Sequence, residues 1–237
     1  MPDLTRIAEP HREPIRKFGA QLQGLAAENG LGWTLYGAIV EGTLERKPPS
    51  IQSVLMLQGI DLDLLRRLGA VGRQYGRFGL APPLVMTPAF LNSIRDTFPL
   101  ELIEIQQAYS IVFGPDYSHD LEFDDRDVRL QCERELDVVS IGLRQGLLAA
   151  SGIEDHLALL QRDWLRGLLR ILRGMLWLKG QKARLPADRV VSEIERTVEL
   201  LLPGIRRALA TSSSPSWEAF HQLHADVTAL GTAVDGW

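Results

Sequence analysis

The hydrophobic pattern of this chain changes its period near residue 120, and this change constrains the fold more than any other feature. From Asp124 onward the apolar residues recur at spacings of three and four, the repeat of an amphipathic α-helix. Further helices are predicted after a possible capping box at Ser151, after Pro186, and after a serine-rich linker near 211–216. The first predicted helix carries Val128, Cys132, Leu136, Val139, Leu143 and Leu147. The second half is therefore predicted to be an all-α bundle.

The residues before this point alternate between short strands and helices. Short apolar runs bounded by glycine, proline and polar residues predict the strands, and helical spacing predicts the helices. Residues 100–112 fit either a helix or a strand. The predicted strands cover 33–36, 51–57 and 84–87, and the predicted helices cover 15–29, 61–75 and 88–97.

Together the two patterns predict an α+β chain with two domains. A small mixed-sheet domain of about three to five strands is expected at 15–120, and an all-α helical bundle at 121–237. Residues 1–14 contain three prolines and charges of both signs, so a flexible arm is expected there.

Composition limits the class of protein. Of the 237 residues, 45% are hydrophobic and 24% charged, which is ordinary for a globular protein, and the net charge of −4 gives no general attraction to nucleic acid. The single Cys132 rules out an internal disulfide and a cysteine-based zinc site. No apolar run reaches the length of a membrane span, and the N-terminus does not resemble a signal peptide. A soluble, cytoplasmic protein is expected.

The segment from Trp33 to Leu57 reads as a strand, a glycine-bracketed turn, a polar loop and a second strand. The turn is Gly37-Ala38, with Gly42 at its far side. Ser50 and Gln52 stand at the start of the second strand, two residues apart. Because side chains alternate along a strand, residues at this spacing point to the same face.

This framework resembles the minimal nucleotidyltransferase domain of the polymerase-beta superfamily. More closely, the chain is similar to bacterial proteins that fuse such a domain to a helical one, and the resemblance spans most of its length. The stretches that carry it are 35–42, 83–88, 98–105, 129–136 and 143–145.

The resemblance implies metal-assisted nucleotidyl transfer, in which two alternating aspartates hold Mg²⁺ and a Gly-Ser turn binds phosphate. This chain departs from the family pattern at each of these points. Ala38 replaces the serine, Glu41 stands where a basic residue is common, and Ser50 and Gln52 replace the aspartates. Neutral side chains bind Mg²⁺ poorly. The hypothesis is therefore a catalytically degenerate homologue, a pseudoenzyme with no metal site and no expected cofactor.

An active Mg²⁺-dependent transferase would need relocated carboxylates. Glu101 and Glu104 are the candidates, although a solvated or ion-paired role is the better interpretation of both. Asp61 and Asp63 alternate, but they stand at a predicted helix start, where a capping role is the better interpretation. In this second hypothesis Mg²⁺ and an NTP are required.

The helical half carries a basic stripe at helical spacing, and it lacks the arginine–histidine signature of HEPN ribonucleases, which are known partners of such domains. A third hypothesis is RNA binding through this stripe. A solvated face, or arginines paired with acids, is favoured instead because no aromatic residues accompany the stripe. The stripe consists of Arg162, Arg166, Arg170 and Arg173.

The leading hypothesis is thus a nucleotidyltransferase-like protein that acts as a binding or regulatory module. Nucleotide contacts, if retained, are expected at Gly37, Ala38 and Gly42. A nucleotide or protein partner is possible, a homodimer through the helical half is plausible, nucleic acid is not favoured, and no membrane association is expected.

Overall fold

A computed structural model provides the structure of the chain. Within helix α7 the side chains of residues 154, 155, 158–163 and 166 lie outside the description. The chain divides into two compact units, which are treated separately below. The sheet-containing unit comprises Met1–Arg95 and Leu102–Glu122, and the helical unit comprises Asp96–Glu101 and Phe123–Trp237. The described residues are 4–5, 7–42, 50–151, 153–210 and 216–237.

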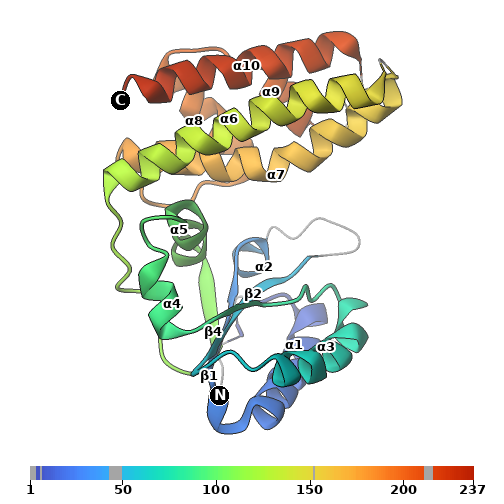
Figure 1. Cartoon of the computed structure of the whole chain (residues 1–237), viewed down its shortest axis with the longest axis vertical. Coiled ribbons are helices and arrows are strands. Elements are labelled where there is room, and N and C mark those ends of the chain that lie inside the picture. The colour runs from blue at the N-terminus through green and yellow to red at the C-terminus, as the bar shows by residue number, and fades with distance from the viewer. Residues whose placement is uncertain (1–3, 6, 43–49, 152, 211–215) are drawn as a thin grey trace. The chain divides into compact units, whose positions relative to one another are not determined.

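The sheet-containing unit is built on a mixed four-stranded sheet in the order β3-β2-β1-β4. Figure 1 labels β1, β2 and β4 of this sheet. Strand β1 pairs antiparallel with both β2 and β4, and β2 pairs parallel with β3. Its elements are α1 (Glu9–Ala26), a 3-10 turn (Ala27–Asn29), β1 (Gly30–Tyr36), α2 (Ala38–Glu41), β2 (Gln52–Leu57), α3 (Leu62–Gly76), β3 (Leu84–Met86), α4 (Pro88–Ser93), α5 (Pro99–Gln107) and β4 (Tyr109–Phe113).

The two faces of this sheet are covered differently. On one face, Trp33, Leu35 and Leu55 form a hydrophobic core with residues of α1 and α3, including Phe18 and Leu64. On the other face, alternate residues of β1 and β2 meet α4 and α5 around a small cavity of about 20 Å³. This volume accommodates roughly one water molecule.

The N-terminal arm differs from its prediction. Helix α1 begins at Glu9, so residues 9–14 are helical and not part of a flexible arm. Pro10 stands in the first turn, where its missing N–H has no partner to lose. Leu4 and Ile7 are buried in the core of the same unit, and this burial anchors the described part of the arm.

The ambiguous stretch at 100–112 contains both a helix and a strand. Helix α5 ends at Gln107 and β4 starts two residues later. The first residues of α5 also belong to the helical unit, so its boundary with the sheet-containing unit is not the single break predicted near residue 120. Leu100 explains this, because its N–H donates to Gln131 Oε1 at 2.8 Å and its side chain packs on Gly174.

The helical unit is an all-α bundle, as its apolar spacing predicts. Helix α6 packs against α7 and α10, and the shorter α8 and α9 pack on α7 and α10. Ser151 is not the predicted N-cap of α7: it ends α6 in a left-handed conformation, and Ile153 precedes α7. No helix in the described ranges is long and apolar enough to cross a membrane. The helices are α6 (Asp125–Ala150), α7 (Glu154–Leu178), α8 (Ala187–Val198), α9 (Pro203–Leu209) and α10 (Trp217–Asp235).

Candidate functional site

The turn after β1 is held in place by backbone hydrogen bonds. Gly37 has φ 75° and ψ −144°, a conformation that a residue with a side chain adopts only with strain. Its N–H donates to the carbonyl of Ala108 at 2.8 Å, and its own carbonyl accepts from Val40 at 2.9 Å. Gly42, with φ 71°, ends the single turn of α2. The predicted residues Gly37, Ala38 and Gly42 therefore share one tight turn, and backbone geometry accounts for both glycines.

Ser50 and Gln52 lie together at the entrance to β2, as the alternation of side chains predicts. Gln52 Nε2 donates a hydrogen bond to Ser50 Oγ at 2.8 Å, and both side chains are half-buried. Gln52 pairs with Tyr36 across the β1–β2 ladder. The two neutral groups thus satisfy each other, and the assignment of these two positions to metal-binding aspartates stays a prediction from the sequence resemblance.

Two tyrosines extend this site across the sheet. Tyr36 pairs with Gln52 on one side and with Tyr109 on the other, so the three side chains project from one face in a single row. The sequence pattern did not identify either tyrosine, because their alignment with Gln52 depends on the register of two separate strand pairs. We call Ser50, Gln52, Tyr36 and Tyr109 the polar row.

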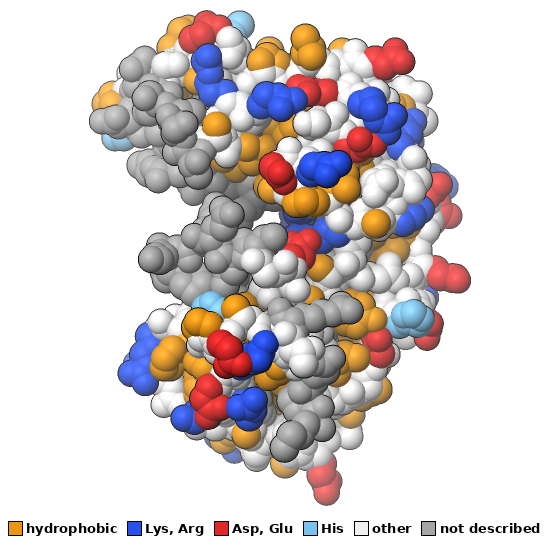
Figure 2. All heavy atoms as spheres, turned by 180° about the vertical axis from the view of Figure 1, so that it is seen from behind, with side chains coloured by type: hydrophobic (Ala, Val, Ile, Leu, Met, Phe, Trp, Pro, Cys, Tyr) orange, Lys and Arg blue, Asp and Glu red, His pale blue; other side chains and the backbone are white. Residues whose placement is uncertain are grey.

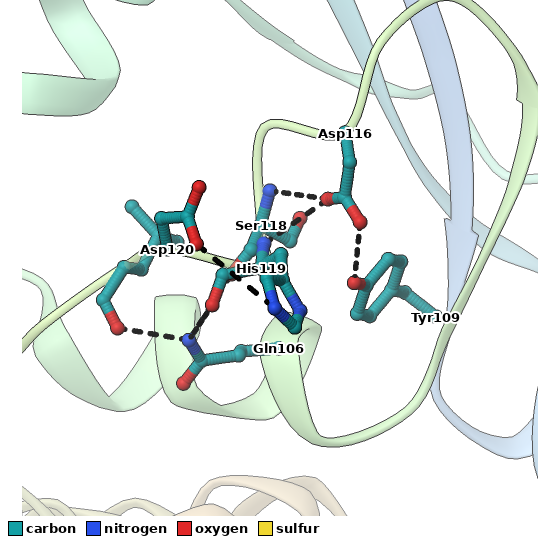
Figure 3. Close-up of polar contacts among 7 residues, drawn as sticks. Gln106, Tyr109, Asp116, Ser118, His119 and Asp120 are labelled. Atoms are coloured by element: carbon teal, nitrogen blue, oxygen red, sulfur yellow. Dashed lines mark hydrogen bonds and ion pairs between the residues drawn. The ribbon is translucent and has the colours of Figure 1, made fainter.

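The loop after β4 forms a hydrogen bond with Tyr109, at one end of this row (Figure 3). The hydroxyl of Tyr109 donates to Asp116 Oδ2 at 2.6 Å, while Asp116 Oδ1 accepts from the backbone N–H groups of Ser118 and His119 at 2.8 and 3.0 Å. Gln106 Nε2 donates to three loop carbonyls, those of Ser118, His119 and Leu121. These bonds hold the loop against α5 and β4.

The electrostatics of this pair keep the proton on Tyr109 at neutral pH. Burial, the hydrogen bond to Asp116 and the negative charge of Asp116 together raise the pKa of Tyr109 to about 12. Partial burial acts to raise the pKa of Asp116, but hydrogen bonds from Tyr109, Ser118 and His119 outweigh it and lower that pKa. At neutral pH Tyr109 is therefore a protonated phenol, and Asp116 is a carboxylate with both oxygens engaged.

Comparison with known proteins identifies the fold. No model of a known protein family matches the chain, and no curated protein matches it significantly. Among solved structures, the chain is similar to the spectinomycin adenyltransferase AAD(9) from Enterococcus faecialis, crystallised with ATP and spectinomycin. The TM-score is 0.62 at 11% sequence identity, and the match covers 94% of this chain and 98% of AAD(9). The fold is nucleotidyltransferase-like. At this identity the likeness concerns the fold alone.

The residues in this nucleotidyltransferase-like fold do not fit a divalent metal at the polar row. A metal site needs several anionic oxygen ligands, whereas Ser50 and Gln52 are neutral and Gln52 directs its N–H group at Ser50. Within the described ranges no group of three or more His, Cys, Asp or Glu side chains is arranged to hold a metal ion. Asp61, one of the alternating acids, caps α3 by accepting from Asp63 and Leu64, as predicted.

The predicted replacement acids lie on α5. Glu101 belongs to the helical unit, where Arg170 Nη1 is 3.1 Å from Glu101 Oε1 and Gln131 Nε2 donates to Glu101 Oε2 at 2.8 Å. A second acid of the same unit, Glu135, lies 3.4 Å from Arg170. Glu101 is thus part of an ion-pair network with Gln131, Glu135 and Arg170. Glu104 is half-buried one turn later on α5.

The described part of the basic stripe makes contacts inside the helical unit. Arg170 is shared between two acids, and Arg173 donates to the carbonyl of Leu185 at 3.3 Å. The side chains of Arg162 and Arg166 lie outside the described residues. On the face seen in Figure 2, Lys and Arg side chains are interspersed with Asp and Glu among the coloured residues. Arg170 and Arg173, the two described arginines of the stripe, therefore have partners inside the helical unit, and the role of the whole stripe stays a prediction.

A histidine pair on α10 forms a second polar cluster. Arg144 Nε donates to His224 Nε2 at 3.0 Å, and His221 lies one turn away beside Trp217. Burial, Arg144 and His221 all lower the pKa of His224, because each disfavours a second positive charge. His224 is therefore a neutral acceptor at physiological pH, with one ring nitrogen already used.

Proposed function

We propose that this protein is a nucleotidyltransferase-fold module that does not carry out Mg²⁺-dependent nucleotidyl transfer and acts by binding, in a regulatory or assembly role. The observation that carries this proposal is the 2.8 Å hydrogen bond from Gln52 to Ser50. Where the family chemistry needs two anionic ligands, this chain has a donor and an acceptor that satisfy each other.

The physical argument concerns charge. In metal-assisted transfer the cations neutralise charge that develops on the phosphates, and carboxylates hold those cations in place. An amide and a hydroxyl at the same positions supply no negative charge, and Glu41 adds a negative charge where the family often has a positive one. Ala38 also lacks the hydroxyl that would contact a phosphate oxygen. The four substitutions act in the same direction, against triphosphate–metal binding.

The polar row supports metal-independent binding of a neutral or weakly charged group. Tyr36, Gln52 and Tyr109 present hydroxyl and amide groups along one face, and the Tyr109 oxygen can act as an acceptor because its own O–H donates to Asp116. AAD(9) was crystallised with ATP, so nucleosides and nucleotides are the first ligands to test. We expect calorimetric titration with each NTP to give the same result with and without Mg²⁺.

The sharpest test restores the missing carboxylates. We expect the wild-type chain to bind no Mn²⁺ at this site by electron paramagnetic resonance, whereas the double variant Ser50→Asp/Gln52→Asp binds it. A matched control, Gln23→Asp/Gln58→Asp, adds the same charge at exposed positions and is expected to bind none. The restored site is expected to make NTP binding depend on Mg²⁺.

Transfer activity of the wild-type protein would contradict the proposal. If Mg²⁺-dependent transfer of a nucleotide is observed and disappears in Glu101→Gln or Glu104→Gln, the hypothesis of relocated carboxylates replaces it. Salt-sensitive RNA binding that is lost in Arg166→Gln/Arg170→Gln would instead favour the third hypothesis, in which the basic stripe is the functional surface.

A further inference from the structure

A groove lies between helices α1 and α3, which pack side by side in the sheet-containing unit (Figure 1). Its volume of about 430 Å³ falls within the range of roughly 300–1,000 Å³ that is typical of small-molecule sites. Both helices cover the face of the sheet opposite the polar row, so the groove is a separate feature. We call it the α1–α3 groove. Its lining includes Pro14 and Lys17 from α1, Tyr75 from α3, and Arg77 and Phe78 just after α3.

Tyr75 is the buried member of this lining, and its hydroxyl is the polar group that points to a ligand. Tyr75 is only 5% exposed, and its ring packs against Phe18 of α1 and against Phe78, with 4.9 and 6.4 Å between ring centroids. The Tyr75 hydroxyl forms no hydrogen bond with any described residue, yet it is not sealed from solvent. Because a buried phenol normally keeps its hydroxyl for a polar partner, this hydroxyl is available to a molecule in the groove.

The charges around the groove favour an anion. The Arg77 guanidinium lies over the ring of Phe78, 4.8 Å from its centroid, and forms no ion pair within the described ranges. Lys17 Nζ lies 3.5 Å from Glu13 Oε1, but Arg16 binds the other oxygen of that carboxylate at 2.6 Å. Glu13 is the acid of the lining, and it therefore shares its charge between two cations. Lys17 and Arg77 together leave an excess of positive charge at the groove.

The uncharged part of the lining indicates that the anion carries a flat apolar group. Pro14 and Phe78 supply apolar surface from the two sides of the groove, and Phe78 is 37% exposed. An inorganic anion would use the cations but leave this apolar surface in water. A guanidinium stacks well on aromatic rings, and Arg77 already does so on Phe78, which leaves its other face for a ring of the ligand. The lining therefore suits an anion with an aromatic ring.

We propose that the α1–α3 groove binds a small aromatic anion. Its carboxylate or phosphate group lies between Lys17 and Arg77, and the Tyr75 hydroxyl donates a hydrogen bond to it. Its ring packs against Phe78 and the Arg77 guanidinium. The site does not depend on the proposed function, because no residue of the polar row lines the groove and neither Mg²⁺ nor an NTP is required. The cations are exposed, so we expect affinity to fall as salt is added.

Calorimetric titration without Mg²⁺ or NTP tests the ligand class. The probes are 1-naphthyl phosphate and 1-naphthoate, with neutral 1-naphthalenemethanol and inorganic phosphate as controls. We expect at least one aromatic anion to bind saturably, and each control to bind at least about tenfold more weakly, because each lacks either the charge or the ring. The tighter of the two anions distinguishes a phosphate site from a carboxylate site. Binding of neither anion, or equally tight binding of the neutral alcohol, overturns the proposal.

Variants locate the binding site. We expect Lys17→Gln/Arg77→Gln to weaken binding by about tenfold or more, because both charge-assisted contacts are lost. The matched control Arg67→Gln/Arg95→Gln removes two exposed arginines outside the groove and is expected to bind normally. Circular dichroism checks that both proteins are folded. Equal affinities of the two double variants would overturn the proposal.

Two single variants separate this groove from the polar row. We expect Tyr75→Phe to weaken binding by about threefold or more, because the packed ring stays and only the hydroxyl is lost. Gln52→Leu changes the polar row on the other face of the sheet and is expected to leave binding unchanged. Loss of binding in Gln52→Leu, with normal binding in Tyr75→Phe, would place the anion at the polar row and overturn the assignment to the groove.

Discussion

Polar groups are satisfied differently in two regions of the molecule. The polar row of the sheet-containing unit relies on neutral hydrogen bonds, whereas the Glu101–Arg170 network of the helical unit relies on ion pairs. In the polar row, Gln52 and Ser50 are neutral and bond to each other. In the network, Arg170 lies between two acids, and Gln131 bonds both to Glu101 and to the backbone of Leu100. Removing one member of a neutral pair exposes a small dipole, whereas removing one ion leaves an uncompensated charge. The two regions should therefore respond very differently to substitution.

The largest effect is expected from Arg170→Met. This change leaves Glu101 and Glu135 half-buried and facing each other without a cation, so we expect unfolding free energy to fall by about 2–4 kcal/mol, measured by urea denaturation. The control Arg207→Met removes an exposed arginine and is expected to change stability by less than about 0.5 kcal/mol. Equal effects of the two variants would show that the network contributes nothing beyond surface charge.

A second buried acid sharpens the comparison within the helical unit. Asp226 Oδ2 accepts from the N–H of Ile205 at 2.9 Å and caps α9, while burial raises its pKa despite this bond. We expect Asp226→Ala to reduce the free energy of unfolding by about 1–2 kcal/mol, because the first turn of α9 loses its acceptor. Asp226→Asn keeps an acceptor without the buried charge and should cost much less. The opposite order in thermal or urea unfolding would mean that charge, and not capping, is what matters.

The polar row is expected to tolerate substitution. Gln52→Leu removes one neutral hydrogen bond and leaves a serine hydroxyl that is still within reach of water, so we expect a loss of about 0.5–1 kcal/mol at most. Chemical denaturation of Gln52→Leu beside Arg170→Met measures the contrast directly. A loss as large as that of Arg170→Met would indicate that the row is a rigid structural element and not a binding surface.

The smallest effect concerns pH. Because the folded-state pKa of His224 is lowered, the unfolded chain binds more protons near and below its ordinary pKa of about 6.5. Stability should therefore decrease as the pH falls from about 7 to 5, and this slope should be shallower in His224→Gln. Thermal unfolding at several pH values measures it. A His224→Gln profile parallel to that of the wild type would show that the Arg144 contact does not bias the imidazole toward its neutral form.

Local patterns in the sequence predicted the elements that depend on neighbouring residues. The spacing of apolar residues located α6 to within a few residues, and Asp61 was correctly identified as a helix cap. The alternation of side chains placed Ser50 and Gln52 on one face. The predicted start of α1 was wrong. Prolines at 10 and 14 suggested an arm, whereas the helix begins at Glu9 and Leu4 and Ile7 before it are buried in the core. Local composition carries no information about that burial.

The sequence by itself determined the two-part α+β architecture and the absence of carboxylates at positions 50 and 52, because both follow from residue type and short-range spacing. Only the tertiary structure decided that Tyr36 and Tyr109 join Gln52 in one row, since strand register depends on pairing between segments up to about 70 residues apart. The same holds for Glu101, whose partner Arg170 is on another helix. The sequence specifies the chemistry of each side chain, but long-range packing determines which other groups neutralise its charge or form hydrogen bonds with it.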